Sequence, residues 1–219
     1  MSAGLGWGGG AALGAKLAAP DRLVVWATGD GSYVFSNPAA CHHAAAALAS
    51  NYIVAAIDAA LGPTWRAQHD QWTGLDPARL RAAIRQRMLA DAKPASRIEY
   101  DDRFALNVTT LASCFPHARF VYLYRDVRET LARMLDRWND AAHLHPSGVH
   151  LSDGRAWHLP LPPGWSARSH KGLPEVVAWQ WSTCTRIALD AFEQLPAPRW
   201  CVTSYDRLLS DPVSEHRRL

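Results

Sequence analysis

The chain has 219 residues, of which 48% are hydrophobic and 20% charged, a globular composition that excludes a disordered or fibrous protein. The formal net charge of +3 slightly favours an anionic small ligand and is too weak to indicate nucleic-acid binding. No stretch matches a membrane span or a signal peptide. The four cysteines form no CxxC pair, which is typical of reduced thiols. We therefore expect a cytoplasmic protein without a membrane partner.

The first part of the chain alternates helices and strands. Its patterns predict helices at 11–18 and 38–49 and strands at 23–28 and 52–57. Gly29-Asp30-Gly31 marks a loop after the first strand. Pro38 then opens the second helix, with Asn37 as its N-cap. This alternation is typical of an α/β sheet.

The pattern breaks at Gly62-Pro63, and residues 63–74 follow no period, so we interpret them as a junction. The rest of the chain alternates again, with predicted helices at 78–90, 104–114, 127–138 and 175–194 and strands at 120–124 and 200–204. Between them, residues 139–174 are predicted to form a long loop, and a last helix begins at 212. The sequence therefore predicts an α/β fold with a mainly parallel sheet flanked by helices.

The N-terminal segment contains GAKLAAPDRLVV followed by GDGSYVFSN, which includes Gly29-Asp30-Gly31 and Asn37. This text resembles the C-terminal cofactor-binding domain of thiamine-diphosphate enzymes of the acetolactate-synthase-like group. The resemblance implies that Asp30 ligates the Mg²⁺ that carries the diphosphate, because a hard cation needs oxygen ligands. The glycines let backbone N–H groups approach the phosphates. We expect Gly29, Gly31 and Asn37 to belong to the same cofactor site.

The segment departs from this family in two ways. The family's motif closes on two Asn residues after a strand, and the second of them ligates the metal. Here the strand ends in Asp58-Ala59, so Asp58 is the remaining metal-ligand candidate. The family's catalytic glutamate belongs to another domain, which we do not find in this sequence. The resemblance therefore predicts a thiamine-diphosphate- and Mg²⁺-binding segment at residues 1–62.

A second resemblance covers residues 75–219. The run ARFVYLYRD at 118–126, with VAWQWSTCT at 177–185 and WCVTSYD at 200–206, resembles sulfotransferases that use 3′-phosphoadenosine-5′-phosphosulfate (PAPS). The family has a P-loop-NTPase-like core, and the resemblance implies that Arg125 holds the 3′-phosphate of the nucleotide. An Arg at the carboxyl end of a parallel strand lies where open α/β sheets bind ligands. Its planar fork matches a phosphate.

Three further residues are candidates through this resemblance. Glu99 aligns with the base that deprotonates the acceptor hydroxyl or amine, although a solvated Glu near neighbouring arginines is an equal alternative. Arg133 stands where the family has a Ser that shares the 3′-phosphate, and it keeps a positive charge there. Tyr205 would lie near the adenine, and a buried core Tyr is its alternative.

The sulfotransferase-like part is predicted to be truncated at both ends and its core incomplete. No phosphate loop precedes residue 75, and the family's last nucleotide-binding segment would lie beyond Leu219. In this interpretation the partners are a small-molecule nucleotide and an unidentified sulfate acceptor, and the missing loop leaves an inactive protein possible.

Three functions therefore remain open. The first is transfer of a sulfuryl group from PAPS to a hydroxyl or amine. The second is binding of thiamine diphosphate with Mg²⁺, and the third is a non-catalytic fusion product. Strands 23–28 and 120–124 side by side in one sheet would favour the first. Two separate patches with open sheet edges would favour the third, because open edges invite aggregation.

Overall fold

The computed structural model describes residues 24–28, 70–72, 76–90, 98–141, 144–145, 148–158, 160–211, 214–215 and 218. In this part of the chain one sheet contains the strands β1 (Val24–Thr28), β2 (Ile98–Tyr100), β3 (Arg119–Tyr124) and β4 (Trp200–Ser204). Their order is β2-β1-β3-β4, and every neighbouring pair is parallel. The predicted α/β fold with a parallel sheet is confirmed.

β1 lies between two strands that come from the later part of the chain. Its residues Val24–Trp26 pair with Ile98–Tyr100 on one side. On the other side, Val24–Thr28 pairs with Arg119–Leu123. The five residues of β1 read VVWAT, the apolar run expected of a strand with a neighbour on each side. The predicted strands 23–28 and 120–124 are thus adjacent in one sheet.

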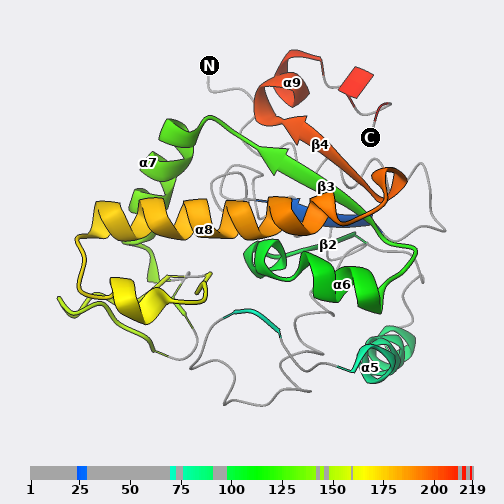
Figure 1. Ribbon diagram of the computed structural model, residues 1–219, viewed down its shortest axis with the longest axis horizontal. Coiled ribbons are helices and arrows are strands. Elements are labelled where there is room, and N and C mark those ends of the chain that lie inside the picture. Colours follow the sequence, from blue (N-terminus) through cyan, green and yellow to red (C-terminus); the bar gives the residue numbers. More distant parts are fainter. Residues whose placement is uncertain are drawn as a thin grey trace.

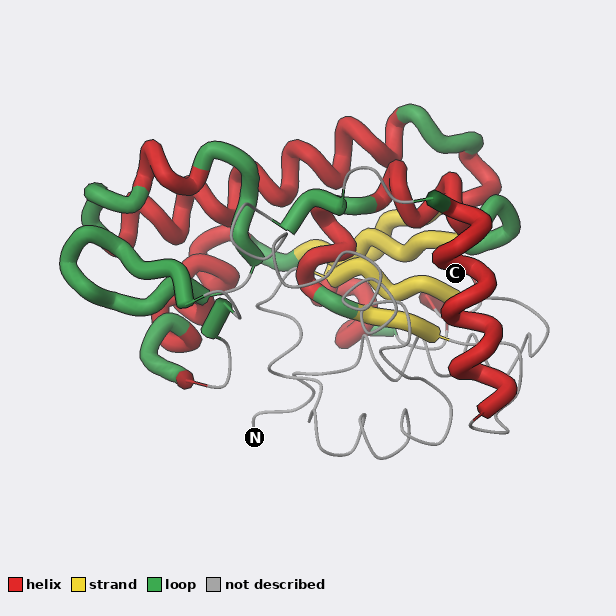
Figure 2. The backbone as a smooth tube through the Cα atoms, turned by 90° about the horizontal axis from the view of Figure 1, so that it is seen from below, coloured by secondary structure: helices red, strands yellow, loops and turns green. Residues whose placement is uncertain are grey.

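The helices pack around this sheet. They are α5 (Pro77–Ala90), α6 (Val108–Cys114), α7 (Val127–Arg137), α8 (Leu173–Glu193) and α9 (Tyr205–Ser210). Figure 1 shows α8 running across the sheet with α6 beside it, and Figure 2 shows the strands side by side with helices above them and at both flanks. Three short 3₁₀ helices are η2 (Asp102–Leu106), η4 (Trp165–Arg168) and η5 (Ala197–Arg199). None of the described helices has both the length and the apolar character needed to cross a bilayer.

The predicted helix at 104–114 is wrong in one respect, because the chain breaks at Asn107. The backbone of Asn107 has φ −130° and ψ 18°, and it separates η2 from α6. The strand β2 and the helix α9 were not predicted. α8 begins two residues before the predicted position 175, since Pro174 is tolerated in a first helical turn. The predicted elements 11–18, 38–49 and 52–57 lie outside the described residues.

One core cluster joins α8 to the sheet through aromatic rings. Phe192 is fully buried, and its ring centroid lies 6.1 Å from that of Phe120 and 5.9 Å from that of Tyr122. Trp200 stacks on the same ring at 5.1 Å. A single α8 side chain therefore holds β3 and β4 together on this face.

A second cluster fixes the long loop against α7 and α8. Its buried members are Met134, Trp138, Leu151, Trp157, Leu161, Val176 and Val177. The rings of Trp138 and Trp157 lie 5.3 Å apart, edge to face. The described part of the predicted loop 139–174 is therefore anchored by apolar contacts, and it contains η4 and two isolated bridges.

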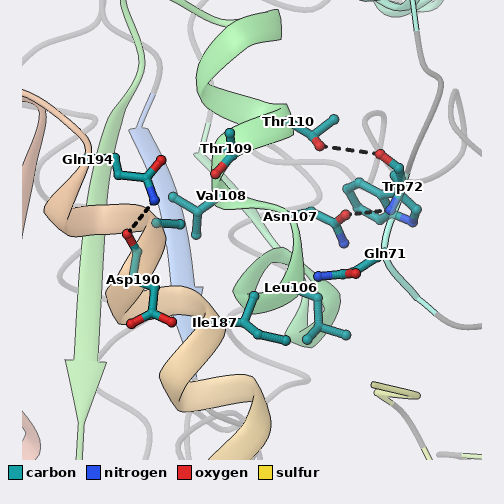
Figure 3. A pocket seen from close by; sticks show the side chains of 11 residues that line it. Gln71, Trp72, Leu106, Asn107, Val108, Thr109, Thr110, Ile187, Asp190 and Gln194 are labelled. Atoms are coloured by element: carbon teal, nitrogen blue, oxygen red, sulfur yellow. Dashed lines mark hydrogen bonds between the residues drawn. The ribbon is translucent and has the colours of Figure 1, made fainter. Parts of the chain in front are cut away.

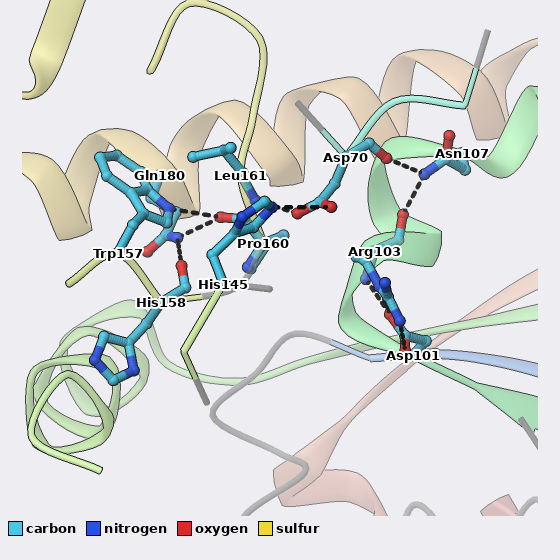
Figure 4. Close-up of polar contacts among 10 residues, drawn as sticks. All are labelled: Asp70, Asp101, Arg103, Asn107, His145, Trp157, His158, Pro160, Leu161 and Gln180. Atoms are coloured by element: carbon cyan, nitrogen blue, oxygen red, sulfur yellow. Dashed lines mark hydrogen bonds and ion pairs between the residues drawn. The ribbon is translucent and has the colours of Figure 1, made fainter. Parts of the chain in front are cut away.

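Residues 70–72 are the described part of the predicted junction, and they are bound to the rest of the molecule on two sides (Figure 4). Asp70 exchanges hydrogen bonds with Leu161: its N–H donates to the Leu161 carbonyl at 2.8 Å, and its Oδ2 accepts from the Leu161 N–H at 2.6 Å. His145 Nε2 lies 3.4 Å from Asp70 Oδ1. On the other side, the Asn107 amide bonds to the backbone of Asp70 and Trp72. Asp70 and Trp72 are thus part of the core.

Candidate functional site

The carboxyl ends of the parallel strands meet at one edge of the sheet. Arg125 directly follows β3 and Tyr205 directly follows β4, and the last residues of these strands, Tyr124 and Ser204, are paired. β1 ends on the other side of β3, with Thr28 opposite Leu123. Open α/β sheets bind ligands at this edge. The topology therefore brings two of the predicted site residues together here.

Arg125 is held between a ring and a carboxylate. Its guanidinium carbon lies 4.8 Å from the centroid of the Tyr205 ring, a cation–π distance. Its Nε donates to Glu129 Oε2 at 2.5 Å, and its Nη2 forms an ion pair with the same oxygen. The Arg125 side chain is 12% exposed, whereas that of Glu129 is 57% exposed. The Arg125 guanidinium is therefore held in place, and the Glu129 carboxylate that balances its charge faces solvent.

This arrangement is suited to an anion that replaces Glu129. The Glu129 carboxylate is mostly exposed, so water can solvate it when another anion takes its place beside Arg125. A phosphate group offers several oxygens to the planar fork of Arg125 and can bind it bidentately. The backbone at the start of α7 adds little to the binding of an anion. The reason is that the Asp126 side chain already accepts hydrogen bonds from the N–H groups of Arg128 and Glu129. Hydrogen bonds from Arg128 lower the pKa of Asp126 below its usual value, so that cap is ionised at neutral pH.

Tyr205 is a core residue that also contacts one of the candidate site residues. It is buried at 2% exposure, as expected of a core Tyr, and it also lies against Arg125. Its position is fixed by Ser204, which caps α9 by accepting from the Arg207 N–H. The ring therefore lies against the guanidinium at the sheet edge.

The other two residues of the second resemblance belong to β2 and α7. Glu99 is the middle residue of β2, and its backbone pairs with Val25. Arg133 lies two turns along α7 from Arg125 and approaches Asp136 to 3.7 Å.

The candidates of the first resemblance lie outside the described residues. These are Gly29, Asp30, Gly31, Asn37 and Asp58. The chain leaves β1 at Thr28, directly before Gly29, beside the strand that Arg125 follows. In the part of the chain that is described, no group of three or more His, Cys, Asp or Glu residues is arranged to hold a metal.

Sequence reasoning missed a group of charged residues at the same edge. Asp101, Asp102 and Arg103 follow β2 directly, and Arg137 reaches them from the end of α7. Both Arg side chains are 9% exposed. β2 has only three residues, IEY, so no strand pattern marked its end as a functional position. In the sequence, the two adjacent carboxylates Asp101 and Asp102 are the feature that could have indicated this charged group.

The described part of the molecule also has a pocket of about 280 Å³ between α6, α8 and residues 71–72 (Figure 3). Its wall is mainly apolar and amide, and the one charged residue that lines it is Asp190. A carboxylate disfavours a phosphorylated ligand. We therefore place the candidate site at the carboxyl edge of the sheet and not in this pocket.

Comparison with known proteins finds a similarity for one part of the chain. Residues 1–95 match the family model for the thiamine pyrophosphate enzyme, C-terminal TPP binding domain. The match extends beyond β1, across residues 63–74 and past the end of α5. No curated protein and no solved structure matches the chain. Within residues 1–95, the chain is therefore similar to the cofactor-binding domain of thiamine-diphosphate enzymes.

Proposed function

We propose that the carboxyl edge of the sheet binds a phosphorylated cofactor, and that this cofactor is thiamine diphosphate carried by Mg²⁺. The observation that supports this most directly is the family match over residues 1–95, which includes β1 and the sequence Gly29-Asp30-Gly31 that follows it. β1 ends beside β3 at the edge where ligands of α/β sheets bind.

In this proposal, different residues bind different parts of the cofactor. Asp30 and Asp58 supply carboxylate oxygens to Mg²⁺, which prefers such ligands and retains water. Gly29, Gly31 and Asn37 belong to the diphosphate-binding loop. Arg125, after the neighbouring strand, adds a positive charge for the diphosphate. In thiamine-dependent enzymes the cofactor supplies a stabilised carbanion, but the proposal for this chain concerns binding alone.

Thermal unfolding of the chain with thiamine diphosphate and MgCl₂ tests this proposal. A ligand at a hundredfold excess over its Kd adds about 2.7 kcal/mol to the folded state. For a chain of this size that corresponds to a rise in Tm of roughly 5–10 °C. We expect Asp30→Ala to abolish the part of the shift that needs Mg²⁺. Absence of a shift in the unmodified chain at saturating cofactor would refute the proposal.

A second candidate ligand is the adenosine 3′,5′-bisphosphate portion of PAPS, and with it sulfuryl transfer. The observation that favours it is β1 beside β3 in one sheet, with Arg125 held over Tyr205 directly after β3. Here Glu99 would act as the base and Arg133 would assist with the 3′-phosphate. The same unfolding experiment with adenosine 3′,5′-bisphosphate and no Mg²⁺ separates the two candidates, since each ligand should shift Tm only if its own site exists.

Arg125→Ala is expected to weaken whichever phosphorylated ligand binds by about 10–100-fold. The reason is the loss of a charge-assisted hydrogen-bond donor worth about 1.5–3 kcal/mol. Calorimetric titration with the ligand measures the change in Kd. Arg128→Ala is the matched control, because Arg128 has the same charge, is the second residue of α7 and has a side chain that is 88% exposed. Equal affinities for the two variants would show that Arg125 does not touch the ligand.

A further inference from the structure

Glu129 occupies the edge of the Arg125 guanidinium through which that side chain can bind an anion. The guanidinium carbon lies over the Tyr205 ring, 4.8 Å from its centroid, and Nη1 is buried. The other two nitrogens, Nε and Nη2, form one edge of the planar fork, and both contact Oε2 of Glu129. A phosphate group that binds this edge bidentately therefore has to displace the Glu129 carboxylate.

The two side chains of this ion pair differ in how easily they can move. Arg125 is 12% exposed and directly follows β3, so its position is set by the sheet and by the Tyr205 ring. Glu129 is 57% exposed and lies in the first turn of α7, which begins shortly after β3 (Figure 1). Rotation about the Glu129 side-chain bonds carries its carboxylate into water and leaves the backbone of α7 in place, since the cap of that helix is Asp126.

We propose that Glu129 is an internal competitor at the carboxyl-edge site: its carboxylate closes the Arg125 edge in the free protein and gives way when a phosphate group binds. The inference rests on the proposed function, since the ligand is the phosphorylated one proposed above. The competition concerns one edge of one guanidinium, so it holds whether the phosphate is free or carried by Mg²⁺. The ion pair must break before the ligand can bind, so the wild-type chain binds phosphate groups more weakly than Arg125 alone would allow.

An ion pair of this spacing also has an ordinary structural role. An acidic side chain in the first turn of a helix is favourable near the positive end of the helix dipole, and pairs four residues apart stabilise helices. That role alone predicts that replacing Glu129 lowers stability and leaves the affinity for anions unchanged. Competition predicts a higher affinity, so binding and unfolding measured on the same variants distinguish the two roles.

Inorganic pyrophosphate with MgCl₂, titrated calorimetrically into the full chain, tests the inference. Pyrophosphate has no organic ring, so it reports on the phosphate-binding part of the site alone. Glu129→Gln should bind it about 2–5-fold more tightly than the wild-type chain, the range expected for removal of one exposed ion pair. Glu129→Asp should also bind it more tightly, because the shorter side chain holds Arg125 less well while the net charge stays the same. The second result would exclude a general effect of charge.

Two controls accompany these variants. Glu175→Gln removes the same charge from α8, where Glu175 is 53% exposed and pairs with Lys171 four residues before it, so this variant should leave the affinity unchanged. In the Arg125→Ala background, Glu129→Gln should no longer tighten binding, because the guanidinium for which Glu129 competes is absent. Thermal unfolding of each variant without ligand shows that it is folded before it is titrated.

The outcomes separate this inference from the proposed function. Equal pyrophosphate affinities for the wild-type chain, Glu129→Gln and Glu129→Asp would overturn the inference and leave the proposed function intact. Equal tightening by Glu129→Gln with and without Arg125 would overturn it too, because the effect would then be one of general charge. Binding of pyrophosphate without binding of thiamine diphosphate would contradict the proposed cofactor, while the variants still decide the role of Glu129. Absence of pyrophosphate binding in every variant would contradict both.

A second measurement observes the displacement in the wild-type chain itself. The side-chain carboxyl carbons of Glu residues are followed by ¹³C NMR, and the Glu129 signal is assigned by its loss in Glu129→Gln. Addition of pyrophosphate with MgCl₂ should move the Glu129 signal and leave that of Glu175 in place. A Glu129 signal that stays fixed while the chain becomes saturated with pyrophosphate would overturn the proposed displacement.

Discussion

Asn107→Ala is expected to destabilise the folded chain by about 3–5 kcal/mol, enough to unfold a marginally stable domain. The side chain of Asn107 satisfies three buried backbone groups. Its Oδ1 accepts from the Trp72 N–H at 2.6 Å, and its Nδ2 donates to the carbonyls of Asp70 at 2.6 Å and Arg103 at 2.7 Å. Alanine leaves all three without this partner, and each such group costs about 1–3 kcal/mol.

Urea unfolding followed by tryptophan fluorescence measures the loss as a lower midpoint. Asn139→Ala is the matched control, because Asn139 is exposed and its amide makes one long bond of 3.4 Å to the Leu135 carbonyl. That variant should change stability by less than about 0.5 kcal/mol. If the two variants unfolded at the same urea concentration, residues 70–72 would not be docked as the structure shows.

Phe192→Ala is the second change for which we expect a large loss, about 3–5 kcal/mol. The cause differs from that for Asn107, since it is a cavity and not an unsatisfied hydrogen bond. Phe192 is fully buried and its ring contacts Phe120, Tyr122 and Trp200, so its removal separates α8 from two strands. A small movement of α8 cannot fill the cavity left by the ring, because the residues around it belong to two different strands.

Phe192→Leu provides the graded comparison in the same urea experiment. Leucine keeps much of the buried volume, so we expect less than half of the loss seen with alanine. Leu209→Ala, at a side chain that is 41% exposed on α9, should have little effect. A Phe192→Ala variant as stable as Leu209→Ala would contradict the packing of α8 on the sheet.

The elements that could be predicted from the sequence are those with strong local patterns. RFVYLY is aromatic and β-branched and is followed by Arg125-Asp126, so both β3 and the position of Arg125 at its end were recognised. α7 begins where Asp126 caps it, which is also a local signal. These features depend on neighbours in the sequence, and they held in the structure.

The features that could not be predicted depend on contacts between distant residues. Helical character at 104–114 was expected, but Asn107 breaks the helix because its side chain binds Asp70 and Trp72, more than 30 positions away. The ion pair between Asp102 and Arg137 likewise joins residues 35 positions apart. Nothing local in either segment indicates its partner. The position of β1 between β2 and β3 also depends on contacts between residues that are distant in the sequence.

The central claim is that β1, from the segment similar to thiamine-diphosphate enzymes, lies between strands formed by the rest of the chain. Hydrogen–deuterium exchange of the intact protein measures this most directly, because amides of a central strand exchange only when the sheet opens. We predict that a peptide containing Val24–Thr28 exchanges as slowly as one containing Arg119–Tyr124. Rapid exchange of Val24–Thr28 while Arg119–Tyr124 remained protected would contradict the account, since β3 would then be stable without β1.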